Sequence, residues 1–247
     1  MKKIIILTLA IYFVLYTIFA QKILYQNIKI LEEIYGNQID EKSYKLYSSI
    51  NSTRIDVLDK NQITYTNLMF FNNYPKMLTI LIDHKNKSYT KKEQDINDLI
   101  NNANQILSDP TISEVLKNLQ ISKTSTQTQV NQKNINATHY KISFQQTNFM
   151  DITIAHKNQI FSEEDLKSYN TITNSNSYKI FDLFQKVPFL QEINQKIQEG
   201  YIIIEISSEY GKYKQKLETI KIIEEPENFF SIPNDYKEIK QNGNKNQ

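Results

Sequence analysis

The sequence predicts an α+β fold in which short amphipathic helices cover one face of an antiparallel sheet. Apolar and polar residues alternate through residues 24–89 and again through 139–155, as in half-buried strands. Residues 93–119 change to helical spacing, and residues 200–240 return to two long strands joined by a tight turn.

The first half of the chain is predicted to form successive hairpins. Turn-forming residues such as Tyr35-Gly36-Asn37 separate the apolar runs. The expected strands are Leu24–Ile34, one strand region from Tyr44 to Leu58, Ile63–Phe71 and Met77–Asp83, followed by Ser88-Tyr89. This order is that of an antiparallel meander.

Two short helices are predicted to follow. From Glu93 to Ser108 the apolar residues are three and four apart, which places them on one helical face. Pro110 ends this helix, and Thr111-Ile-Ser-Glu114 has the pattern of a capping box for a second one. Both helices need an apolar partner, and we expect the preceding sheet to provide it.

The second half repeats the order of strands and then helix. Strands are expected at Ile121–Val130, His139–Phe144 and Phe149–Ala155. A helical zone begins after Ser162 and ends at Gly200, a predicted C′ residue.

The final hairpin is the clearest strand pair in the chain. Ile202, Ile204 and Ile206 alternate with polar residues and are predicted to point to one face. On the return strand Leu217 and Ile220 have opposite parity, which predicts a β-bulge and a bend between them. The hairpin leads to Phe230-Ser-Ile-Pro-x-x-Tyr236, and residues 241–247 are expected to form a disordered tail.

The N-terminus has the pattern of an export signal. Met1-Lys2-Lys3 precedes an apolar run over residues 4–19 and the small residue Ala20. The run is shorter than the ~20 residues of a typical transmembrane helix. We therefore predict that residues 1–20 are a signal peptide or an N-terminal anchor and that residues 21–240 form one domain. No cysteine follows the run, which excludes a lipid-anchored lipoprotein.

Composition excludes several classes of function. Once the two lysines of the export signal are removed from the 29 basic residues, the remainder balances the 27 acidic residues. A nucleic-acid partner is therefore not expected. The absence of cysteine excludes disulfides, thiolate catalysis and cysteine-based metal sites.

No residue set has the pattern of a catalytic or metal centre. His84, His139 and His156 lack metal-ligand spacing, and surface roles are expected for them. The chain has no glycine-rich phosphate loop and no G-x-S-x-G motif. We therefore predict a protein without cofactor or metal that is not an enzyme.

Arg54 is the only arginine in the chain. One interpretation is a strand arginine paired with a neighbouring acid. The other is that its five N–H donors contact a helical lid or the head group of a ligand.

The chain resembles the LolA-like superfamily of bacterial envelope proteins, and most closely an uncharacterised periplasmic family within it. The resemblance is carried by the export signal, by the order of strands and helices, by Ile80-Leu-Ile-Asp83 with Lys87-Ser-Tyr89, and by Phe229-Phe-Ser-Ile-Pro233-Asn-Asp-Tyr236. It implies a strongly curved antiparallel sheet, an incomplete barrel whose concave face is closed by helices. It also implies a periplasmic location and transport of lipids or acyl chains, with Arg54 matching a strand arginine that contacts the helical lid. The proline and aromatic residues that follow this arginine in the lipoprotein carrier are missing here.

Two functions from different classes remain open. The first is a non-catalytic carrier or sensor that binds a hydrophobic or lipidic ligand between sheet and helices. The second is a structural or protein-interaction module of the cell envelope with a closed core. The residues predicted to line the ligand cavity are Ile80, Ile82, Leu99, Ile106, Ile202, Ile204 and Ile206, with Arg54 at the lid or head group. If residues 4–19 are retained, they would tether the protein to the membrane.

Overall fold

The computed structural model describes residues 20–34, 38–107, 110, 114, 117–176, 191–208 and 213–240. The strands are β1 (Ala20–Ile34), β2 (Gln38–Ser48), β3 (Ser52–Asp59), β4 (Gln62–Asn73), β5 (Lys76–Asp83), β6 (Ser88–Asp95), β7 (Leu119–Val130), β8 (Lys133–Phe144), β9 (Thr147–His156), β10 (Tyr201–Ser208), β11 (Tyr213–Pro226) and β12 (Lys237–Glu238). The helices are α2 (Ile96–Leu107), α4 (Glu163–Thr173) and α5 (Gln191–Gln198), with 3-10 turns η1 (Lys157–Gln159) and η4 (Glu227–Phe230). Within these residues, none of the helices combines the length and the apolar composition needed to span a membrane.

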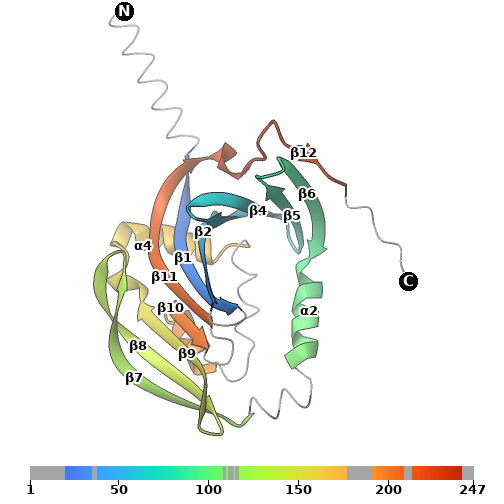
Figure 1. Ribbon diagram of the computed structural model, residues 1–247. Helices are drawn as coiled ribbons and strands as arrows, with labels where there is room; N and C mark the ends of the chain where they lie inside the picture. The colour runs from blue at the N-terminus through green and yellow to red at the C-terminus, as the bar shows by residue number, and fades with distance from the viewer. Residues whose placement is uncertain are drawn as a thin grey trace, which may run out of the picture.

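All twelve strands belong to one sheet, in the order β12-β6-β5-β4-β3-β2-β1-β11-β10-β9-β8-β7. β12 pairs in parallel with β6, while the other neighbours are antiparallel, so the sheet is mixed. The sheet curves, with β1 and β11 as long bent strands at its middle (Figure 1). β12 and β7 lie at its two ends, and no ladder between described residues joins them into a barrel.

The predicted fold class, an α+β half-barrel with helices covering its concave face, is therefore wrong. The region from Tyr44 to Leu58 forms two strands, β2 and β3, because the chain turns at residues 49–51. Residues 88–95 extend as β6 although the helical spacing was predicted from Glu93, and α2 begins only at Ile96, where the Asn97 N–H donates to Asp95 Oδ1 at 2.8 Å. The expected second helix after Pro110 lies largely outside the described residues.

The predicted bulge is confirmed. Asn27 of β1 faces Thr219 of β11, while the next residue, Ile28, faces Leu217, so Glu218 is the extra residue. The shift brings Leu217 and Ile220 into the same apolar cluster, although their parity differs. The parity break in the sequence therefore predicts the position at which β11 is irregular.

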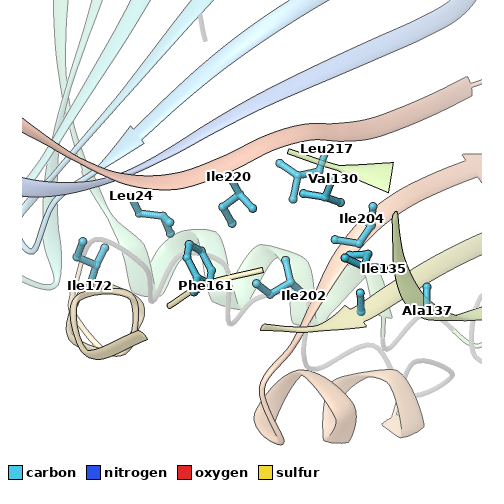
Figure 2. Close-up of a cluster of buried hydrophobic side chains, with 11 residues drawn as sticks. Leu24, Val130, Ile135, Ala137, Phe161, Ile172, Ile202, Ile204, Leu217 and Ile220 are labelled. Carbon is cyan, nitrogen blue, oxygen red and sulfur yellow. The ribbon is translucent and has the colours of Figure 1, made fainter. Parts of the chain in front are cut away.

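The main core lies where β1 and β11 meet the helical segment after β9. Leu24 and Ile220 point from the sheet toward Phe161 and toward Ile172 of α4 (Figure 2). α4 begins as predicted, because the Ser162 side chain accepts a hydrogen bond from the Asp165 N–H. Gly200 follows α5 with φ +97°, the left-handed conformation expected of a C′ glycine.

The strands β1–β5 carry different partners on their two faces. One face packs against α4 through Leu24 and against α2 through Met69 and Phe71; we call it the helix face. The opposite face packs against the segment 227–240 through Leu68 and Ile82; we call this segment the C-terminal strap and this face the strap face.

Candidate functional site

The structure does not bring the predicted cavity residues together. Ile202 and Ile204 belong to the main core, but Ile206 pairs with Ile152 of a different cluster, because β10 is irregular between Ile203 and Glu205. Ile80 and Ile82 lie on the strap face, whereas Leu99 of α2 packs on the helix face. The side chain of Ile106 lies outside the described residues.

Arg54 contacts the C-terminal strap. Its Nε donates to both carboxylate oxygens of Asp56, at 2.9 and 3.2 Å, and its Nη1 donates to the Phe229 carbonyl at 2.9 Å. The guanidinium carbon also lies 4.7 Å from the centre of the Phe229 ring. Pairing with a neighbouring acid is thus the arrangement observed, and the arginine also attaches the strap to the sheet.

A chain of side-chain hydrogen bonds continues from Asp56 across the strap face. Thr66 Oγ1 donates to Asp56 Oδ1 at 2.6 Å and lies 2.8 Å from His84 Nε2, while His84 Nδ1 lies 2.9 Å from the Tyr236 hydroxyl. Because the single Thr66 proton goes to Asp56, Nε2 must carry the proton that Thr66 accepts. Burial lowers the pKa of the His84 imidazole, which favours the form in which Nδ1 carries no proton and accepts from the Tyr236 hydroxyl.

This order of groups does not make a nucleophile. In a hydrolytic triad the histidine accepts the hydroxyl proton and the acid orients the histidine. Here the Thr66 hydroxyl donates to the acid, and both Asp56 and Thr66 are 1% exposed. The contacts attach Phe229 and Tyr236, the ends of the predicted C-terminal motif, to β3 and to His84, the residue that follows β5.

The other two histidines have local partners. His139 lies 3.2 Å from Thr153 Oγ1 and 3.3 Å from Asp151 Oδ1. His156 accepts from the Asn158 N–H at the start of η1. Within the described part of the chain, no group of three or more acidic or histidine side chains could hold a metal ion.

The helix face carries a different kind of polar group. Five buried side-chain oxygens have no hydrogen-bond partner among the described residues, and all five project from this face: Gln26 Oε1, Ser48 Oγ, Thr53 Oγ1, Asn67 Oδ1 and Thr79 Oγ1. We call them the polar stripe. A sixth such atom, Asn148 Oδ1, belongs to β9.

The strand register places the polar stripe in two adjacent rows. The first row runs Leu24, Ser48, Thr53, Met69 and Thr79, and the second runs Gln26, Leu46, Ile55, Asn67 and Leu81. Directly paired residues have Cβ atoms ~5 Å apart, and the rows cross β1 to β5 without a gap. Polar and apolar side chains are thus mixed in these two rows, which together we call the band.

The band reaches solvent at one end. Leu81, in the second row, is 46% exposed, and Tyr65, two residues before Asn67 on β4, is 45% exposed. The opposite end at Leu24 is fully buried against the core that contains α4. An apolar edge therefore leads from solvent to buried oxygens that lack a partner among the described residues.

Leaving polar atoms unpaired is costly. Each buried group without a partner destabilises a fold by about 1–3 kcal/mol, and native proteins contain few of them. Five on one face of five consecutive strands are therefore the feature most in need of a functional explanation. Sequence reasoning missed them, although Ser48 and Thr53 stand at the strand ends flanking residues 49–51, where only pairing across the turn makes them neighbours.

No protein-family model matches the sequence, and no curated protein matches it. Among solved structures, the chain is similar to PNGF-II in a P21 crystal form, with a TM-score of 0.37 and 9% identity over 90% of this chain and 32% of that one. It is similar to PNGF-II in a C2 form with a TM-score of 0.35 and 10% identity, over 91% of this chain and 31% of that one. The chain thus spans about a third of those chains, and similarity at this level defines neither a shared fold nor a shared activity. The LolA-like resemblance stays a prediction.

Proposed function

We propose that this is an exported envelope protein that binds a hydrophobic or lipidic ligand on the helix face, as a non-catalytic carrier or sensor. The observation that carries the proposal is the polar stripe, set between aliphatic side chains and leading to the exposed Leu81. The predicted location is the periplasm, with residues 4–19 either removed or retained as a tether.

The arrangement of packing supports binding between sheet and helices. α2 contacts the helix face through Ile96 and Leu99, and α4 through Ile172, while the strap is attached to the other face. A ligand can therefore exchange with helix–sheet contacts without breaking any strand ladder. The exchange costs little, because apolar area buried against a ligand contributes the same ~25 cal/mol per Å² as area buried against a helix.

The proposal is tested by native mass spectrometry and lipid extraction of residues 21–247 purified from an export-competent host. We expect a co-purifying lipid or the uptake of a fluorescent acyl probe, and we expect competition between the two. Protein that is recovered empty and takes up no acyl probe would contradict the proposal.

The alternative is a structural or protein-interaction module of the envelope. It is favoured by Arg54, whose Nε and Nη1 contacts are both internal to the fold. Under this alternative, crosslinking in envelope preparations would give one stoichiometric protein partner, and acyl probes would neither bind nor displace that partner.

A further inference from the structure

The five oxygens of the polar stripe differ in the partners they accept. The amide oxygens Gln26 Oε1 and Asn67 Oδ1 accept hydrogen bonds only, whereas the hydroxyls of Ser48, Thr53 and Thr79 both donate and accept. A ligand that pairs with these five atoms therefore carries hydroxyl or N–H donors and oxygen acceptors. A plain hydrocarbon chain would leave all five atoms unpaired.

The band contains no charged side chain among its five strands. Its two rows hold only the polar stripe and the aliphatic or thioether side chains of Leu24, Leu46, Ile55, Met69 and Leu81. On the β6 side the first row continues with the charged residue Lys92, which pairs with Thr79 and is exposed. Neutral polar groups are therefore complementary to the band, because a buried phosphate or carboxylate would find no charged partner within its two rows.

The length of the band limits the shape of a ligand that can pair with it. It crosses β1 to β5, which is four spacings between neighbouring strands, or about 19 Å. Polar positions recur between apolar ones across that width. An extended chain with polar groups between apolar stretches fits this pattern, whereas a compact polar head group does not.

We propose that the helix face selects an amphiphile whose acyl chain carries hydroxyl or amide groups, and that these groups hydrogen-bond to the polar stripe. The inference rests on the proposed function and adds the chemical class of the ligand. Aliphatic contacts with Leu46 and Ile55 hold the chain, and Gln26, Thr53 and Asn67 distinguish a substituted chain from a plain one.

The test uses two matched pairs of probes and the purified protein. Palmitate is compared with β-hydroxypalmitate, and methyl palmitate with N-methylpalmitamide, by isothermal titration calorimetry or by displacement of a fluorescent acyl probe. In each pair the second member adds one donor at nearly constant apolar area. We expect it to bind about tenfold more tightly, the factor of one hydrogen bond to an otherwise unpaired buried group.

A variant then locates the preference. The double variant Thr53→Val, Asn67→Leu removes two members of the polar stripe. We expect both members of each probe pair to bind it with about equal affinity, while palmitate still binds. The matched control is Thr64→Val of β4, which lies outside the two rows and whose hydroxyl donates to the Val57 carbonyl; this variant should keep the preference.

The outcomes separate the two proposals. If no probe binds, the proposed function fails together with the inference. If plain and substituted probes bind equally to the unmodified protein, the function stands and the inference is overturned. A preference that survives in the Thr53→Val, Asn67→Leu variant would also overturn it, since the selecting groups would lie elsewhere.

Discussion

On the strap face of β3 and β4, Asp56 and Thr66 are buried and joined in a continuous hydrogen-bond chain from Arg54 to Tyr236. On the helix face of the same strands, Thr53 and Asn67 carry buried oxygens that have no hydrogen-bond partner in the part of the chain that the structure describes. The same strands carry both faces, but the strap-face network contains the charged pair Arg54 and Asp56, whereas the polar stripe consists of neutral side chains. Among the described residues, the polar groups of the strap face therefore have partners within the chain, whereas those of the polar stripe do not, and we propose that a ligand pairs with them.

The strap face should be the more sensitive to the loss of a polar group. Asp56→Ala leaves the Arg54 guanidinium without its carboxylate in a partly buried site and removes the acceptor of Thr66. We expect the free energy of unfolding to fall by about 3–5 kcal/mol. Urea denaturation measures it as a lower midpoint at constant slope.

The control is Asp59→Ala at the exposed end of β3, which should change the free energy by less than about 0.5 kcal/mol. If Asp56→Ala and Asp59→Ala lower the free energy of unfolding equally, the buried contacts of Asp56 would stabilise the fold no more than an exposed carboxylate does.

Structural features that depend on neighbouring residues could be predicted from the sequence, whereas features that join distant residues could not. The bulge at Glu218 follows from the parity of Leu217 and Ile220, and the helix end follows from Gly200, because both are local signals. Alternation also predicts which residues share a face within one strand. It cannot say which face meets a helix, so Ile80 and Leu99 were assigned to one cavity although they lie on opposite faces.

The network and the stripe could not be predicted for a related reason. Arg54 was recognised because it is the only arginine, but its contact with Phe229 joins residues 175 positions apart. The five stripe residues come from five strands and are common residue types in this sequence. Only the strand register brings them into two adjacent rows, and two of the strands, β2 and β3, were predicted as a single strand region.

A smaller effect is expected from pH. Burial lowers the pKa of His84 from its ordinary value of 6.5, with the Asp56 and Asp83 carboxylates opposing the shift and Arg54 adding to it. The unfolded chain then binds more protons than the folded one just below pH 6.5, so the free energy of unfolding falls as the pH drops from 6.5 through the folded pKa.

His84→Gln should remove this part of the pH dependence. Urea midpoints at a pH well above and a pH well below the unfolded pKa, measured for both proteins, give the difference that belongs to His84. The same pH dependence in both proteins would mean that His84 titrates in the folded protein as it does in the unfolded chain.

The comparison between the two faces is tested most directly by one pair of variants, Thr53→Val and Thr66→Val. Both threonines are 1% exposed and lie on adjacent strands, and valine keeps the shape while removing the hydroxyl. We predict opposite signs in urea denaturation of the ligand-free protein. Thr66→Val should lose about 1–3 kcal/mol, because Asp56 and His84 each lose a partner, whereas Thr53→Val should be neutral or gain up to ~1 kcal/mol. Equal destabilisation by both variants would contradict the account, since Thr53 would then have a partner within the folded chain.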